Sequence, residues 1–84
     1  MKFWAKTVKN EKLLQNLVMT NELPLNRDNF ESFLMKICES LDIPTPVTLP
    51  THYDYLNSFN IVKYFPRDFV EFVDFELFSI ENVE

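Results

Sequence analysis

The sequence contains no glycine, and this absence excludes several kinds of binding and catalytic site. Glycine supplies backbone with positive φ and allows a ligand to approach the main chain closely. A phosphate-binding P-loop, a Gly-x-Gly-x-x-Gly dinucleotide fingerprint and a Gly-x-Ser-x-Gly nucleophile elbow all require it at fixed positions. The chain carries none of these three signatures, and we therefore predict that it is not an enzyme.

Cysteine and histidine are almost absent too. The single cysteine, Cys38, cannot form a disulfide within the chain. Together with the single histidine, His52, it cannot supply the four nitrogen or sulfur ligands of a structural zinc site. We therefore expect no metal and no other cofactor. A small domain without disulfides suits a reducing compartment, so the predicted location is the cytoplasm.

Long hydrophobic runs are missing as well. Lysine interrupts the first ten residues too often for the apolar stretch of about 7–15 residues in a signal peptide. No window approaches the roughly 20 apolar residues that a membrane-spanning helix needs. We expect a soluble protein with no membrane partner.

Basic side chains are few and unevenly placed. Residues 1–25 carry four lysines against two glutamates, whereas residues 26–84 carry four basic side chains against eleven carboxylates. From Asp68 onward there are six acids, and none of the eight lysines and arginines follows. Nucleic acids bind proteins through clustered basic side chains, so this distribution predicts no nucleic-acid partner.

Aromatic side chains, in contrast, are abundant: the 84 residues include nine Phe, three Tyr and one Trp. A chain of this length buries only about 60–65% of the surface that its unfolded form exposes, so its core must be rich. Two separate cores would each be too small to fold unaided. We therefore expect residues 1–84 to form a single domain.

Alternation of side chains predicts a β-hairpin at the start of the chain. Lys2–Lys9 and Lys12–Thr20 are rich in strand-forming residues, and Asn10-Glu11 between them suits a two-residue turn. The leucines within 13–19 also permit a helix. A polar loop over residues 21–26 follows.

The clearest helical signal lies between Asp28 and Leu41. Asp28 and Glu31 have the spacing of a capping box. An apolar stripe at helical spacing follows, formed by Phe30, Phe33, Leu34, Ile37 and Leu41. Pro44 ends the helix, because the residue before a proline is pushed out of the helical region.

The second half of the chain predicts shorter elements. Three prolines make residues 44–50 an extended strap, either at an edge of the sheet or as a crossover. Thr51 opens a short helix to about Phe59, with Tyr55, Leu56 and Phe59 turned inward. Residues 60–65 form an extended link, and a helical turn runs from Pro66 to about Phe72.

A third strand is predicted over Val73–Val83, with a bulge at Leu77-Phe78 where the alternation changes face. It would pair with the N-terminal hairpin, because an isolated two-stranded ribbon is marginal in water. The predicted fold class is α+β: a small antiparallel sheet, made of the hairpin and the C-terminal strand, packed on one main helix and one or two short helices.

The chain resembles a group of short, uncharacterised bacterial proteins. The similarity rests on Ile37–Pro46, which contains the Leu-Asp-Ile-Pro turn after a helix, on His52, and on residues 65–81. In that group the C-terminal segment has a Phe-x-Pro-x-Asp-Phe…Val-Asp-Phe pattern. The resemblance implies a bacterial cytosolic protein whose role is unknown, and it assigns no site residues.

Two polar residues form a candidate site. His52 lies two positions before Asp54, so the imidazole could act as a general base or as one metal ligand oriented by the carboxylate. The simpler interpretation is an ordinary residue in the first turn of a helix. Cys38, beside two acids and at the edge of the apolar stripe, is interpreted as a small core residue rather than a reactive thiol.

The C-terminal third supplies a candidate interface. Its carboxylates lack the loop pattern of a calcium site, and they alternate with apolar residues as on a solvated face. Seven aromatic residues lie between Phe59 and Phe78, and any of them left exposed would mark an interface. The predicted interface residues are Phe65, Phe69, Phe72, Asp68, Glu71 and Asp74.

These observations lead to one functional prediction and one alternative. We predict a small protein-interaction module that binds a partner protein or a second copy of itself through this acidic, aromatic surface. The alternative is a small enzyme or ligand-binding protein that uses His52 and Asp54 beside a cleft under the proline strap.

Overall fold

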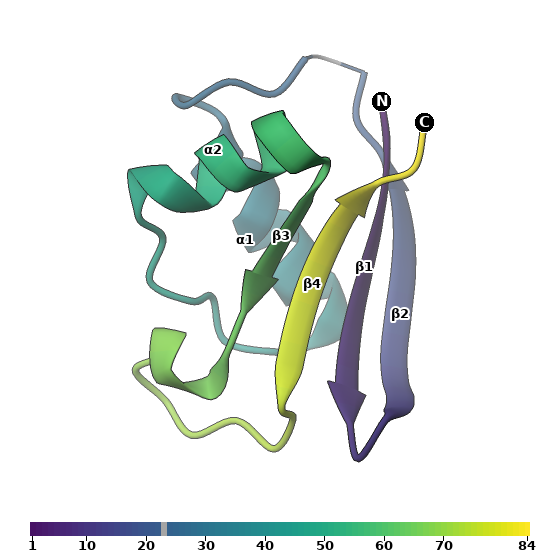
Figure 1. The fold of residues 1–84 in the computed structure, drawn as a ribbon, viewed down its shortest axis with the longest axis vertical. Helices are drawn as coiled ribbons and strands as arrows, with labels where there is room; N and C mark the ends of the chain where they lie inside the picture. The colour runs from purple at the N-terminus through teal and green to yellow at the C-terminus, as the bar shows by residue number, and fades with distance from the viewer. Residues whose placement is uncertain (23) are drawn as a thin grey trace.

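The computed structural model describes residues 1–22 and 24–84, and it places four antiparallel strands in one sheet with two helices against it (Figure 1). Leu23, within the predicted loop 21–26, lies outside the described residues. The elements follow in the order β1 (Lys2–Lys9), β2 (Lys12–Thr20), α1 (Phe30–Leu41), α2 (Pro50–Phe59), β3 (Ile61–Tyr64), a 3₁₀ turn (Pro66–Asp68) and β4 (Leu77–Asn82). The strand order across the sheet is β2-β1-β4-β3. The predicted α+β class is confirmed.

The hairpin has the predicted bounds, and residues 13–19 are strand rather than helix. Asn10 and Glu11 both have positive φ, 52° and 63°, as the tight turn between twisted strands requires. The β-bulge of the sheet lies here rather than at Leu77-Phe78. Thr7 pairs with Gln15 and Val8 with Leu13, so Leu14 is the additional residue.

The C-terminal strand is shorter than predicted and lies in the middle of the sheet. Val8 pairs with Leu77, and β1 ends at Lys9, so the residues before Leu77 have almost no partner strand left. For this reason β4 begins at Leu77 and not at Val73. Within β4 the register is regular, so Phe78 and Ile80 face the core without any change of face.

The predicted link at residues 60–65 contains a fourth strand. β3 pairs with β4, from Ile61 opposite Glu81 to Tyr64 opposite Phe78. Three apolar or aromatic residues in four positions fit a strand, but a segment this short becomes one only when a partner lies beside it. Asn60, with φ 62°, closes α2 and turns the chain into this strand.

Helix α1 keeps the predicted apolar stripe but begins differently. Its N-cap is Asn29, and no side chain caps it. Instead, the Asn26 side-chain oxygen accepts hydrogen bonds from the Asp28 and Asn29 N–H groups, at 2.8 and 2.9 Å. The predicted Asp28–Glu31 capping box is therefore wrong. Asp42, with φ 57°, ends the helix in the left-handed conformation that glycine usually supplies.

Helix α2 starts at Pro50, one residue before the predicted Thr51 box, with Leu49 as its N-cap. Proline suits this first position because its missing N–H needs no partner there. Of the three residues predicted to turn inward, only Leu56 is buried, while Tyr55 and Phe59 are more than half exposed. The helix packs on β3 and less extensively on β4, and six of its ten residues are exposed.

The core lies between the helices and one face of the sheet. In β1, β4 and β3, every second side chain points toward the helices. These side chains are buried against the α1 stripe and Leu56, and they are Phe3, Ala5, Val62, Tyr64, Phe78 and Ile80. Neither of the two helices in the described part of the chain lies on the opposite face of the sheet (Figure 1).

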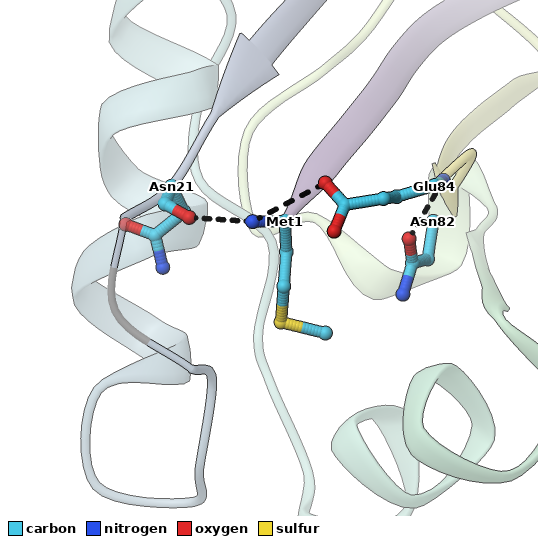
Figure 2. Close-up of polar contacts among 4 residues, drawn as sticks. All are labelled: Met1, Asn21, Asn82 and Glu84. Atoms are coloured by element: carbon cyan, nitrogen blue, oxygen red, sulfur yellow. Dashed lines mark hydrogen bonds and ion pairs between the residues drawn. The ribbon is translucent and has the colours of Figure 1, made fainter.

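The two ends of the chain meet beside β1. The Met1 amino group donates a hydrogen bond to the Asn21 carbonyl at 2.8 Å and lies 3.5 Å from the Glu84 carboxylate (Figure 2). The Glu84 N–H in turn donates to the Asn82 side-chain oxygen at 3.1 Å. These contacts connect the residues at the end of the central strand β4 to the start of its neighbour β1.

Candidate functional site

The segment between the 3₁₀ turn and β4, residues 69–76, forms an exposed loop with a buried base. Phe69 and Phe75 are only 8% and 7% exposed, and their rings pack edge to face with centroids 5.3 Å apart. Between them, Val70 and Phe72 are 89% and 90% exposed. We call Val70, Glu71 and Phe72 the loop apex. The buried aromatic pair holds this apex away from the core.

Polar contacts fix both ends of the same loop. On the entering side, the Val47 N–H donates to the Asp68 carbonyl at 2.8 Å. On the leaving side, the Glu76 N–H donates to the Val8 carbonyl at 2.9 Å, and the Glu76 carboxylate accepts from the Asn10 N–H. The loop is therefore attached to the proline strap at one end and to the hairpin at the other.

An ion pair adds to this attachment. The Lys9 ammonium lies 2.7 Å from the Asp74 carboxylate, which accepts a hydrogen bond from it. This contact raises the pKa of Lys9, first through the hydrogen bond and then through the charge of Asp74. Because both groups are exposed, the pair orients the loop more than it stabilises the fold.

The six predicted interface residues separate into two groups. Phe72 and Glu71 are exposed at the apex, and Phe65 is partly exposed with the Arg67 guanidinium 4.9 Å above its ring. The others hold the structure: Phe69 is a core residue, Asp74 binds Lys9, and the Asp68 carboxylate accepts the Phe65 N–H at 2.7 Å to start the 3₁₀ turn. Val70 was not predicted, although it lies in the same apolar run.

His52 and Asp54 do not form a pair. The Asp54 carboxylate binds the Arg27 guanidinium at 2.8 Å. The His52 Nδ1 accepts the Leu49 N–H at 2.9 Å, and its ring lies against Tyr64 with centroids 4.4 Å apart. Partial burial lowers the pKa of His52, and the nearby charge of Asp68 opposes this effect. The imidazole is thus an acceptor at the start of α2, which is the role that Glu or Gln takes in a capping box.

The cleft under the proline strap contains neither of these two residues. It is lined by Arg27, Phe30, Glu31, Thr48, Leu49, Pro50 and Tyr53. Tyr53 donates its hydroxyl hydrogen to the Leu25 carbonyl at 3.2 Å, and Arg27 is engaged with Asp54. The Thr48 hydroxyl donates to the Pro46 carbonyl at 3.4 Å. Glu31 is therefore the remaining polar side chain of the lining, which brings no nucleophile and base into contact.

Two buried titratable groups, Cys38 and Tyr64, lie outside the lining of this cleft. Burial raises the pKa of the Cys38 thiol to about 11, although a hydrogen bond with Thr45 acts in the opposite direction. A thiol with so high a pKa is protonated and unreactive at neutral pH. Burial also raises the pKa of Tyr64. Thr48 lies close enough to Tyr64 to oppose this increase in pKa. Among the described residues, however, the Tyr64 hydroxyl forms no hydrogen bond.

Comparison with protein families, with curated proteins and with solved structures gives no match for this chain. In the described residues, no helix has the length and apolar character to cross a membrane. Residues 1–22 and 24–84 also contain no group of three His, Cys, Asp or Glu side chains arranged to share a metal ion.

Proposed function

We propose that this chain is a protein-interaction module that binds a partner protein through the loop apex. The observation that carries the proposal is the exposure of Phe72. Six of the nine phenylalanines are buried, and Phe72, at 90%, is the most exposed large hydrophobic side chain in the described chain. Exposed apolar side chains gathered at one place mark interaction sites on small domains.

The attachment of the loop supports the same proposal. Binding costs conformational entropy when a flexible segment must be ordered, and a loop fixed beforehand avoids much of this cost. The Phe69–Phe75 pair and the Lys9–Asp74 ion pair fix the loop at its base. Phe72 and Val70 would enter an apolar pocket, and Glu71 between them favours a partner with a basic rim around that pocket.

We propose no catalytic role. This part of the proposal is supported by the separate engagement of the two candidate residues, His52 with Leu49 and Asp54 with Arg27. The cytoplasmic location and the bacterial origin implied by the resemblance remain predictions alongside it.

Affinity purification with matched variants tests the proposal. Tagged wild-type protein, Phe72→Ser and Phe59→Ser are used to capture partners from a bacterial lysate, with quantitative mass spectrometry of the eluates. Phe59 is a suitable control because it is also a largely exposed phenylalanine but lies on α2. We expect a stoichiometric partner that Phe72→Ser loses and Phe59→Ser retains. An identical set of captured proteins for all three chains would contradict the proposal.

Sedimentation equilibrium decides whether the partner is a second copy. A concentration-dependent dimer that Phe72→Ser abolishes would identify self-association through the apex. A monomer at all concentrations, together with an apex-dependent protein from the lysate, would identify a different chain as the partner.

A further inference from the structure

The open face of the sheet gathers lysine side chains from distant parts of the sequence. Lys6 of β1 is opposite Ser79 of β4, and Ser79 is opposite Lys63 of β3. Residues opposite one another in antiparallel strands point to the same face. Since Phe78 and Ile80 face the core, the row Lys6–Ser79–Lys63 lies on the open face.

The two ammonium groups have no carboxylate partner. Among the described residues, ion pairs join only the Met1 amino group, Lys9 and Arg27 to acids. Lys6 instead lies 4.3 Å from the centroid of the Trp4 ring, beside it on the same face. Glu81, two residues after Ser79 on the same face, is half-buried and forms no ion pair with either lysine among the described residues. This face is therefore a basic region on a chain whose net charge is −5.

Ser79 is a second, independent sign of a binding site. The residue is 1% exposed, and its hydroxyl has no hydrogen-bond partner among residues 1–22 and 24–84. An unpaired buried hydroxyl destabilises a protein, because the group loses its bonds to water and gains none in exchange. Its neighbours in the row are Lys6 and Lys63, whose long flexible side chains can cover a hydroxyl between them and can move aside. A ligand carboxylate that draws both ammonium groups toward itself would also give this hydroxyl an acceptor.

Apolar side chains adjoin the row. Trp4 and Val8 of β1, Leu77 of β4 and Ile61 of β3 are half-buried on the same face. Lys6 and Lys63 belong to strands separated by one other strand, so their backbones are about 10 Å apart. Alternate side chains of an extended peptide are about 7 Å apart, which is within reach of two flexible lysines. Acidic and apolar residues in alternation would match this surface.

We propose that the open face of the sheet, centred on Lys6, Ser79 and Lys63, binds an acidic extended polypeptide segment of a partner protein. Carboxylates of the segment contact the two ammonium groups and the hydroxyl, and its apolar side chains cover Trp4 and Ile61. The charges favour a peptide over a nucleic acid. Two lysines neutralise few phosphates, and the net charge of −5 repels a long polyanion.

Trp4 makes the proposal directly measurable. It is the only tryptophan, and it lies on the proposed surface in contact with Lys6. The probe is a short synthetic peptide of alternating glutamate and leucine, and the control peptide has glutamine in place of glutamate. We expect a saturable change in Trp4 emission with the glutamate peptide only. No saturable change, or an equal response to the glutamine peptide, would overturn the proposal.

A matched pair of lysine variants locates the binding. Lys63→Gln removes one ammonium group without disturbing the reporter ring, whereas Lys36→Gln removes an exposed lysine on α1. We expect Lys63→Gln to weaken binding about tenfold, as the loss of one charge-assisted hydrogen bond predicts, and Lys36→Gln to leave it unchanged. Equal effects of the two substitutions would show general attraction between charges and refute a site on this face.

Ser79→Ala separates a binding role from a structural one. Removal of an unpaired buried hydroxyl should raise the melting temperature, while the glutamate peptide should bind more weakly. A lower melting temperature would mean that the hydroxyl is bonded within the protein, and unchanged affinity would exclude it from the site. Finally, an oligothymidylate that binds more tightly than the peptide at the same salt concentration would replace the proposed class of partner.

Discussion

Two phenylalanines three residues apart, Phe69 and Phe72, should lose very different amounts of stability on the same substitution. Phe69 is 8% exposed and packs against Phe75 and Phe78, with ring centroids at 5.3 and 6.5 Å. Phe72 is 90% exposed and has no aromatic partner within the described residues. Truncation to alanine therefore removes a packed ring in one case and a solvated ring in the other. The loop apex can serve binding only if its side chains are not required for folding.

The expected magnitudes differ widely. Loss of a buried phenylalanine ring costs about 3–5 kcal/mol, because a cavity remains where the ring was. A domain of this length has a total stability of about 4–13 kcal/mol, so Phe69→Ala should bring the protein close to unfolding. Substitution of an exposed side chain such as Phe72 should change the free energy of unfolding by less than about 0.5 kcal/mol.

Urea denaturation followed by circular dichroism measures both effects. Because Phe69→Ala could prevent folding altogether, Phe69→Leu serves as a milder variant, with an expected loss of about 1 kcal/mol. The loss in the free energy of unfolding should increase in the order Phe72→Ala, Phe69→Leu, Phe69→Ala. If Phe72→Ala cost as much as Phe69→Leu, the loop would be packed differently from the structure, and the reasoning behind the apex would fail.

Three further substitutions test local features. Glu11→Gly should stabilise the protein by up to about 1 kcal/mol. Glu11 has φ 63°, and only glycine adopts this left-handed region without steric cost. A lower free energy of unfolding in urea denaturation would contradict this expectation. Tyr64→Phe should raise the melting temperature, because it removes a buried hydroxyl without a partner, which costs about 1–3 kcal/mol; a decrease would reveal a bond to the hydroxyl. For His52, burial lowers the pKa below its ordinary 6.5, so the unfolded chain takes up the proton first. The contribution of His52 to stability should be fully present above pH 6.5. It should be lost as the pH falls from 6.5 toward the lowered pKa of the folded protein, because protonated Nδ1 can no longer accept the Leu49 N–H. Subtraction of the pH profile of His52→Asn isolates this contribution, and identical profiles would exclude it.

Local signals predicted the elements that are stabilised by neighbouring residues. Alternating side chains and the Asn10-Glu11 turn gave both strands of the hairpin their observed bounds. Helical spacing located α1 and its buried stripe to within two residues. The caps were less predictable, because Asn26, Asn29 and Asp28 are all good capping residues and only the path of the chain selects among them.

The candidate surfaces depended more on distant contacts. The aromatic residues from Phe59 to Phe78 predicted an interface, and two of its predicted residues, Phe72 and Glu71, are exposed at the loop apex. This pattern could not separate Phe72 from Phe69, because both belong to the same aromatic run and only the Phe69–Phe75 contact buries one of them. The row on the open face was not predicted at all, since its residues come from three strands far apart in the sequence.

The sequence by itself determined the absence of glycine-dependent sites, the α+β class, the hairpin and the main helix. Each of these depends on composition or on residues a few positions apart. The tertiary structure alone decided that β3 is a strand, that β4 begins at Leu77, and that Lys6, Ser79 and Lys63 are neighbours. Alternation shows which side chains of a strand share a face. It does not show which strand lies alongside or which face the helices cover, because those contacts join residues distant in the chain.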